Sequence, residues 1–518
     1  MRRCDCLECA NHRSVRRRAA KPNCNHRGIP EMELTALEHA MGPERVSRDP
    51  STLERHSADI SFVNRVRPAS LVAPKTAAEV QALLKFANDT RTPLVPVSSG
   101  APHFRGDTVP GVGGALVVDL SGMKQIMMVD RERRVAMCEP GVTFGELIPA
   151  AAKAGLRLNM PLLPRQTKSV IGSILEREPV VMPKYQWDIS DPLACAEIYF
   201  GNGEVFRTGQ AAGPGSIEKQ RAVGGVQKAP YGPGTASLHR LIQGAQGTMG
   251  IVTWLSMRCE ILPSIEEPFF VGSSNLDQLL ELAHWLIRLG TVNECFILNN
   301  TNLATIFADE SAAARQSLKA SLPAWTLFYT VAGGEYFPEE RVSSQIKDIA
   351  EISQRLGVEA ARAIGRVSAR AMLKAVQQPC TDTYWKLRPK GACQDLFFLT
   401  IREKLEGQIA AMGELAEKNG YAATDMGIYI QPIVQGTSIH CEFNLFYDAG
   451  NVRERNQVKD LNGLATREMM ARGGFFSRPY GDDARTIANR DAASASVLHT
   501  FKKIFDPNNL MNPGKICF

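Results

Sequence analysis

The stretch "PLVPVSSGAPHFRGDTVPG", Pro93 to Gly111, joins a strand pattern to a loop of small residues. A β-branched run favours a strand, which Ser98-Ser99-Gly100 ends. Small residues let the backbone approach a ligand closely, and consecutive backbone N–H groups can bind an anion. Taken alone, the stretch is more typical of an ordinary strand-to-loop connection, so the rest of the chain must decide between these interpretations.

A strand, turn, helix, strand pattern leads into this loop in "RPASLVAPKTAAEVQALLKFANDTRTPLVPV", residues 67–97. Thr76 is the expected N-cap of the helix, and Glu79 completes a capping box three residues later. The helical period predicts a buried stripe of Val80, Leu83, Leu84 and Ala87.

Short strands with turn signals follow the loop. They include "ALVVDL", "RVAMCEPG" and "AEIYFGNGEVFRTG", where Asn202-Gly203 predicts a hairpin turn. A longer strand, "GTMGIVTWLSMRCEILP", is opened by glycines. Because strands and helices do not alternate regularly, residues 55–265 are expected to form an α+β domain.

From about residue 266 the pattern changes to long amphipathic helices between antiparallel-type strands. The helices are "LDQLLELAHWLIRLG", "ERVSSQIKDIAEISQRLG" and "REKLEGQIAAMGELAEKNG", and Gly420 ends the third. A second α+β unit is therefore expected, and the chain after residue 460 is mainly helical.

The net charge of +6 is located in residues 1–30, which carry eight basic and two acidic side chains. The remaining chain is neutral, so nucleic-acid binding by the folded part has no support from charge. No apolar run is long enough for a transmembrane helix, and no secretory signal is recognisable. A cytoplasmic location is the default expectation.

Four of the twelve cysteines lie in the first 24 residues: Cys4, Cys6, Cys9 and Cys24. Four thiolates suit tetrahedral zinc or an iron–sulfur cluster. Their spacing departs from common zinc-knuckle spacing, and a disordered basic tail explains the segment equally well. The other eight cysteines are scattered, which is typical of reduced core residues.

Taken together, the ordered segments resemble the flavoprotein superfamily of vanillyl-alcohol oxidase and para-cresol methylhydroxylase. The segments are the stretch around Ser98, "CEPGVTFGEL", "SVIGS", "FRTG", "GAQGTMGIVT" and "FDPNNLMNPGKI". The resemblance implies an α+β chain with an FAD-binding domain of the para-cresol methylhydroxylase type at 31–265 and an α+β cap (substrate) domain at 266–460. It also implies that residues 461–518 return to the FAD domain, with residues 1–30 as a Cys/Arg-rich extension.

The resemblance further implies which residues hold FAD. The pyrophosphate would meet Ser98, Ser99, Gly100, Ala101, Pro102 and His103, and other cofactor contacts would come from Pro140, Gly141, Val142, Ser169, Gly172, Ser173, Gly247, Gly250, Ile251 and Val252. Many relatives tether the flavin through a histidine, but Gly427 occupies that position, so FAD is expected to be non-covalent. His103 and Tyr384 are remote alternatives for a tether.

Two predicted strands supply candidate pocket residues. In "GIYIQP", Tyr429 and Gln431 share a face with Gly427, because side chains on one face recur every second residue. In "IHCEFNLF" the polar face holds His440, Glu442 and Asn444, and the apolar face is expected to be core. The polar face fits either solvent or the site.

The segment "GGFFSRPYG" supplies Arg478, which the resemblance identifies as a clamp for an anionic substrate. A guanidinium stabilises a carboxylate or phenolate, or negative charge developing on the flavin. Ser477 replaces the tyrosine that the superfamily has before this arginine, so an alkylphenol substrate is in doubt. Tyr480 and Glu442 are candidate proton acceptors.

The resulting hypothesis is an FAD-dependent oxidase or dehydrogenase that takes hydride from an alcohol, hydroxy acid or phenol-like anion. Electrons would pass to O2 or to a redox protein, and a homodimer or larger complex is expected. The alternative is a flavin-containing or catalytically inert subunit with an electron-relay or structural role in a larger redox complex.

Overall fold

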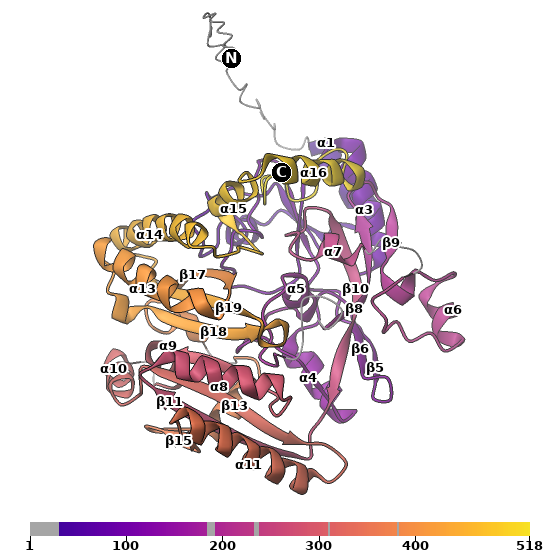
Figure 1. The fold of residues 1–518 in the computed structure, drawn as a ribbon. Coiled ribbons are helices and arrows are strands. Elements are labelled where there is room, and N and C mark those ends of the chain that lie inside the picture. Colours follow the sequence, from indigo (N-terminus) through magenta and orange to yellow (C-terminus); the bar gives the residue numbers. More distant parts are fainter. Residues whose placement is uncertain (1–30, 184–191, 233–237, 309–310, 381–382) are drawn as a thin grey trace, which may run out of the picture.

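The computed structural model describes residues 31–183, 192–232, 238–308, 311–380 and 383–518. Three main sheets organise these residues (Figure 1). The small elements between them are η1 (Pro43–Arg45), α10 (Ala312–Ala320), β15 (Ala363–Ile364), β16 (Val367–Ser368), η4 (Ala423–Asp425) and η5 (Val434–Gly436). None of the helices in the described ranges is long and apolar enough to cross a membrane.

The first sheet has four strands in the order β1 (Val46–Ser47), β2 (Ser70–Val72), β4 (Leu116–Asp119) and β3 (Leu94–Val97). The last three are parallel. Its helices are α1 (Glu31–Met41), α2 (Pro50–Arg55) and α3 (Ala77–Thr90). The Thr76 side chain accepts a hydrogen bond from the Glu79 N–H, which confirms the N-cap, and the predicted stripe of α3 is buried. The Glu79 carboxylate accepts from the Lys75 N–H (2.6 Å) instead of the Thr76 N–H, so the predicted capping box is not formed in full.

The second sheet has the order β5 (Ile126–Asp130), β6 (Val135–Cys138), β10 (Gly250–Ile261), β8 (Leu193–Phe200) and β9 (Val205–Arg207), and β7 (Leu156–Leu158) also pairs with β10. The predicted hairpin is confirmed, because β8 and β9 pair antiparallel around Asn202-Gly203. Gly203 has a φ of 86°, which glycine adopts without strain. The helical elements here are α4 (Phe144–Lys153), α5 (Val170–Leu175), η2 (Gly209–Ala212), α6 (Ile217–Ala222) and α7 (His239–Ile242).

The third sheet has seven antiparallel strands in the order β14 (Ala360–Ala361), β11 (Ile265–Ser273), β13 (Trp325–Gly333), β12 (Cys295–Asn299), β18 (Gly427–Ile433), β19 (Ser438–Asp448) and β17 (Gly391–Thr400). One face packs against α8 (Leu276–Arg288), α11 (Pro338–Leu356), α13 (Arg402–Lys418) and α14 (Val452–Ala471). The other face meets α9 (Asn300–Phe307), α12 (Ala369–Val376), η3 (Trp385–Leu387) and residues 162–181. This second face turns toward the first two sheets (Figure 1).

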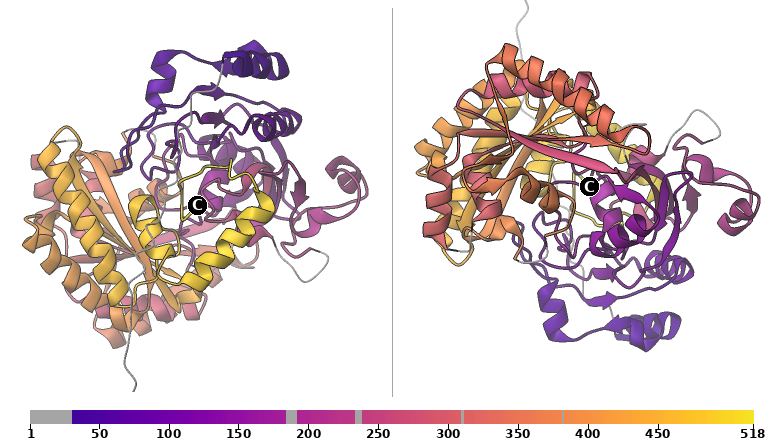
Figure 2. Two further views of the ribbon diagram at one scale, coloured as in Figure 1. Left: turned by 90° about the horizontal axis from the view of Figure 1, so that it is seen from above. Right: turned by 90° about the horizontal axis from the view of Figure 1, so that it is seen from below.

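The C-terminal segment runs back from the seven-stranded sheet to the first two sheets through α15 (Gly481–Ala488) and α16 (Ala492–Phe505), shown in yellow in Figure 2. Leu94 donates its backbone N–H to the Leu510 carbonyl (2.8 Å) and accepts from the Asn512 N–H (2.8 Å). The end of the chain therefore lies along β3, directly before the loop that begins at Ser98.

A buried ion pair fixes this return. The Lys502 Nζ donates to the Asp506 carboxylate (2.6 Å) and the Met511 carbonyl (2.9 Å), and the two side chains are 4% and 0% exposed. We expect Lys502→Met to lower the free energy of unfolding by about 3–5 kcal/mol, because Asp506 is left buried without its cation. Urea unfolding checks this, with exposed Lys503→Met of the same helix as control. Equal losses in both variants would contradict it.

Candidate functional site

Two cavities join end to end between the three sheets. The first, called the sheet cavity, lies against β17–β19 and η3 and encloses about 1030 Å³, counting its open mouth. The second, called the glycine cavity, encloses about 770 Å³ and is lined by Gly172, Gly244, Gly247 and Gly250. They share Pro96, Ser98, Asp107 and Glu176, so they form one elongated trough.

The loop after β3 lies at the junction of the two cavities. Gly100 donates its N–H to the Thr167 carbonyl (2.9 Å), and the Ser99 hydroxyl accepts from the Ser169 N–H (3.0 Å). Within the described part of the chain, the backbone N–H groups of Ser99, Ala101 and His103 have no partner. The loop is thus held in place while it keeps several donors for an anionic ligand.

Part of the predicted cofactor set lines this trough. Ser98, Ser99 and His103 lie in the sheet cavity, and Pro140, Gly172, Gly247, Gly250 and Val252 lie in the glycine cavity. A Cβ atom at Gly172 would lie 3.3 Å from the Ser98 Oγ and 3.4 Å from the Ser99 Oγ. A methyl group here would already touch both serine hydroxyls, and a larger side chain would have to displace them.

We expect Gly172→Val to weaken FAD binding about tenfold or more, because the added methyl groups push against both serines and narrow the trough. Titration of apoprotein with FAD measures the dissociation constant. The control is Gly407→Val in α13, where a Cβ atom meets open space. An affinity for FAD equal to that of the control would contradict the placement.

Other predicted cofactor residues lie outside the cavity surface. The side chains of Val142 and Ile251 are buried in hydrophobic clusters. Gly141 packs so closely that a Cβ atom would lie 2.4 Å from the Ser121 carbonyl oxygen. The Ala101 side chain is exposed, and Pro102 is half-buried after a cis peptide bond. These residues shape the backbone of the wall.

Ser169 and Ser173 support the same wall through hydrogen bonds within the protein. The Ser169 hydroxyl donates to the Pro140 carbonyl (2.6 Å) and accepts from the Gly172 N–H (3.0 Å), which caps α5. The Ser173 hydroxyl donates to the Glu178 carboxylate (2.7 Å). Their hydroxyls therefore position cavity residues from behind.

Strands β18 and β19 present alternate side chains to the sheet cavity. Tyr429 and Glu442 line it, whereas Gln431 is fully buried behind and accepts from the Tyr429 hydroxyl (2.8 Å). The predicted apolar face of β19 is confirmed as core: Ile439, Cys441, Phe443 and Leu445. Its polar face is buried as well, so it belongs to the interior of the molecule.

Gly427 has no room for a side chain. A Cβ atom there would lie 2.0 Å from the Asn302 Oδ1, and the Asn302 amide donates to the Asn444 side chain (2.8 Å). The Asn302 amide fills the space beside Gly427, and non-covalent binding of FAD stays a prediction.

Sequence patterns missed a buried cation on this wall. The Lys386 Nζ, in η3, donates to the Asp395 carboxylate (2.7 Å) and the Glu442 carboxylate (2.5 Å), and the Asn444 amide donates to both carboxylates (2.7 Å each). We call Lys386, Asp395, Glu442 and Asn444 the sheet cluster. The sequence signal was a polar Asp395 inside the apolar strand "ACQDLFFLT".

The sheet cluster has unequal carboxyl groups. Burial alone would raise the pKa of Glu442, but Lys386 and His440 hold it well below its usual range. Burial raises the pKa of Asp395, and the neighbouring Glu442 charge adds to this. Burial lowers the pKa of His440 to about 4, so this imidazole is neutral at pH 7.

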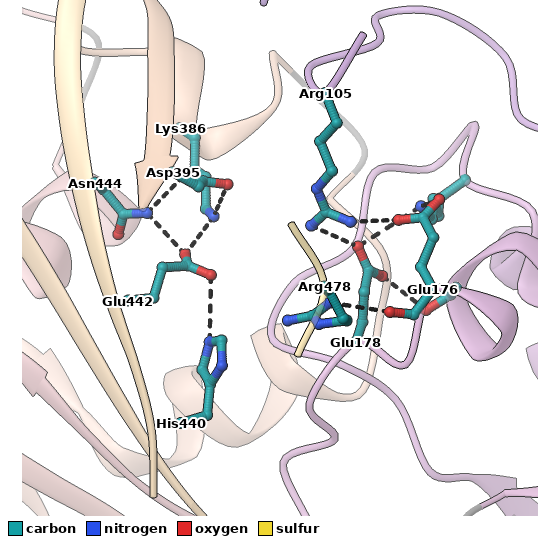
Figure 3. Close-up of polar contacts among 11 residues, drawn as sticks. Arg105, Glu176, Glu178, Lys386, Asp395, His440, Glu442, Asn444 and Arg478 are labelled. Atoms are coloured by element: carbon teal, nitrogen blue, oxygen red, sulfur yellow. Dashed lines mark hydrogen bonds and ion pairs between the residues drawn. The ribbon is translucent and has the colours of Figure 1, made fainter. Parts of the chain in front are cut away.

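A second charged group faces the sheet cluster across the sheet cavity (Figure 3). We call its residues, Arg105, Lys168, Glu176, Glu178 and Arg478, the arginine wall. Arg105 pairs with Glu176 and with Glu178 (3.2 Å), and Lys168 pairs with Glu176 (2.6 Å). Arg478 is 2% exposed and donates to the Glu176 carbonyl (3.2 Å). Sequence patterns identified Arg478 alone, and Arg105 lies 71 and 73 residues from its two carboxylate partners, so no local spacing pointed to it.

Three further predicted residues have settled protonation states. Tyr480 lies between the glycine cavity and a third, outer cavity, and burial raises its pKa, so the phenol stays protonated. Within the described ranges its hydroxyl has no partner. Burial and the charge of Arg165 lower the pKa of His103 to about 3. Tyr384 lines the sheet cavity, and burial raises its pKa also.

The candidate metal ligands Cys4, Cys6, Cys9 and Cys24 lie outside the described residues. Among the residues that the structure does describe, no group of His, Cys, Asp or Glu side chains has a metal-binding arrangement. Binding of zinc or an iron–sulfur cluster by the N-terminal cysteines therefore stays a prediction.

Comparisons with known proteins agree with this geometry. Residues 68–209 match a family described as FAD binding domain. The flavoprotein subunit of 4-cresol dehydrogenase [hydroxylating] from Pseudomonas putida is 21% identical over 86% of this chain and 87% of that protein. Glycolate oxidase subunit GlcD from Bacillus subtilis is 23% identical over 93% and 95%.

The crystal structure of p-cresol methylhydroxylase with substrate bound has the same fold, with a TM-score of 0.81 at 19% identity, covering 95% of this chain and 98% of that chain. The predicted resemblance is thus confirmed for the fold and for the FAD binding domain.

Proposed function

We propose that this chain, an FAD-linked oxidoreductase with its FAD binding domain at residues 68–209, oxidises a small anionic substrate in the sheet cavity. The observation that carries the proposal is the continuous trough. Ser98 lines both of its cavities, the backbone N–H groups of Ser99 and His103 beside it have no partner among the described residues, and two charged walls face each other in the sheet cavity. Bound FAD supplies the acceptor for a hydride.

The residues of the trough would have different roles in binding the cofactor and the substrate. The loop at Ser98 to His103 would hold the pyrophosphate through its backbone donors. Arg478 would bind the anionic group of the substrate, and Tyr429 and Glu442 would line the pocket beside it. Gln431 would hold the Tyr429 ring in place through its hydroxyl. Tyr480, which stays protonated, would donate a hydrogen bond.

Anaerobic mixing tests the proposal. The FAD-loaded protein is mixed separately with 4-cresol, glycolate, lactate or mandelate, and the flavin absorbance at about 450 nm is followed. Bleaching by at least one compound supports an oxidoreductase of this class. Absence of bleaching by every compound, in protein that binds FAD, would contradict it.

We expect FAD to be non-covalently bound, because Gly427 carries no side chain and Asn302 fills the space beside it. Precipitation with acid should release all of the flavin into the supernatant. A yellow pellet after washing would contradict this expectation and would direct attention to Tyr384 or His103 as a tether.

A second function is favoured by the names of two relatives, each described as a subunit. In that case the chain passes electrons to a partner protein, and turnover with O2 is slow although substrate bleaches the flavin. Comparing reoxidation of the flavin by O2 with reduction of an added cytochrome c separates an oxidase from such a subunit.

We also propose that the chain forms a homodimer, which size-exclusion chromatography tests.

A further inference from the structure

Asp395 lies where the sheet cavity meets the outer cavity, which is also lined by α14 and α15. Besides Asp395, the two cavities share Phe104, Arg105 and Arg478. Its carboxylate therefore borders both the proposed reaction space and a second space about 1240 Å³ in size, counting its open mouth.

The sheet cluster holds the Asp395 carboxylate in a fixed orientation. Its Oδ2 accepts from the Lys386 ammonium and its Oδ1 from the Asn444 amide, at 2.7 Å each. The same two donors also bind Glu442. Two carboxylates thus share one ammonium group, which leaves the buried cluster one positive charge short of neutrality.

The two carboxyl groups differ in proton affinity. Glu442 also faces the His440 imidazole, whose Nε2 lies 3.4 Å from its Oε2, and it keeps a low pKa. Asp395 has a raised pKa because burial and the Glu442 charge outweigh Lys386. The titratable and charged groups that face Asp395 are Lys386, Glu442, Cys393, Tyr384 and Arg105.

Resting on the proposed function, we propose that Asp395 accepts the hydroxyl proton of a substrate whose oxidised carbon carries that hydroxyl, with its anionic group on Arg478. The O–H bond breaks as its proton passes to the Asp395 carboxylate. The C–H bond breaks as its hydride passes to the flavin. The alcohol carbon becomes a carbonyl carbon, and the substrate loses two electrons.

The facing walls fit such a hydroxy acid better than an alkylphenol. The arginine wall supplies a cation for a carboxylate, and the sheet cluster opposite supplies a base (Figure 3). An alkylphenol carries its hydroxyl on the ring and not on the carbon that is oxidised, so with its oxygen on Arg478 it would place no hydroxyl proton beside this base. Ser477, the neighbour of Arg478, provides no phenol group to support a phenolate.

Anaerobic stopped-flow reduction of the FAD-loaded protein tests the inference, with glycolate, lactate, mandelate and 4-cresol as probes. We expect a hydroxy acid to reduce the wild type, with a rate that falls at low pH as Asp395 takes up a proton. Asp395→Asn should lower the rate about 100-fold or more and abolish that acid limb. Glu442→Gln should slow the reaction but keep the limb, and exposed Asp348→Asn should match the wild type.

Two results would overturn the inference while leaving the proposed function intact. One is reduction by 4-cresol and by none of the hydroxy acids. The other is an acid limb that persists in Asp395→Asn. If no probe reduces the FAD-loaded wild type, both proposals fall.

A second variant keeps the test decisive where Asp395→Asn does not bind FAD. Asp395→Glu retains a carboxylate, so it should keep a measurable rate and an acid limb at a shifted pH. An Asp395→Glu protein that binds FAD and reacts at the wild-type rate without any acid limb would overturn the inference.

Discussion

Arg478→Met is expected to lower the rate of flavin reduction by a hydroxy acid about 10²- to 10³-fold. Arg478 is 2% exposed, and its guanidinium lies over the Phe397 ring at 4.3 Å, so its position is fixed before a substrate arrives. Burial and the charge of Arg105 lower its pKa to about 10, which still leaves it charged at pH 7. Methionine keeps the apolar stem and removes the charge.

The measurement is the anaerobic reduction rate across a range of substrate concentrations, because it separates binding from the hydride step. Arg478→Lys should recover part of the loss, since an ammonium keeps the charge but not the two-pronged geometry. Exposed Arg485→Met in α15 serves as the control. A wild-type rate and affinity in Arg478→Met would show that another group holds the anion.

Lys386→Met is expected to have the second large effect, this time on stability as well as activity. The ammonium neutralises two buried carboxylates, Asp395 and Glu442. Without it they repel each other, and the free energy of unfolding at pH 7 should fall by about 3–5 kcal/mol. Urea unfolding measures this, with exposed Lys418→Met as the control.

The pH dependence of Lys386→Met follows from the same charges. Loss of the cation raises the pKa of both carboxyl groups, because each keeps a like charge beside it. One of them then takes up a proton as the pH falls, so the loss of stability should shrink between about pH 7 and pH 5. The acid limb of the reduction rate should move to higher pH. A stability loss that stays constant with pH would contradict this account.

Local patterns predicted much of the fold because their physical causes are local. The N-cap at Thr76 and the Asn202-Gly203 turn each depend on a few adjacent residues, and the structure confirms both. The alternation of β19 separates core from polar face by the geometry of a strand alone. What the pattern left open was the burial of the polar face, which depends on η3, whose Lys386 binds Glu442, and on α9, whose Asn302 binds Asn444.

The charged clusters were not predictable in this way. Lys386 meets Glu442 across 56 residues, and Arg105 meets Glu178 across 73, so no spacing in the sequence links them. The first pair forms because η3 lies against β19, and the second because the loop after β3 lies against the segment after α5. Likewise, Val142 and Ile251 belong to cofactor-associated motifs, yet their side chains are buried in hydrophobic clusters. In this chain, the motifs predict which backbone segments lie near the trough better than they predict which side chains line it.

The most direct test of the account is the visible absorbance spectrum of the purified, full-length protein, combined with the amount of FAD per chain. The trough predicts one FAD per chain, with flavin absorbance maxima at about 370 and 450 nm. Acid should release this FAD intact. A colourless protein that stays colourless after incubation with excess FAD would contradict the account, because the glycine cavity and the loop at Ser98 would then hold something else.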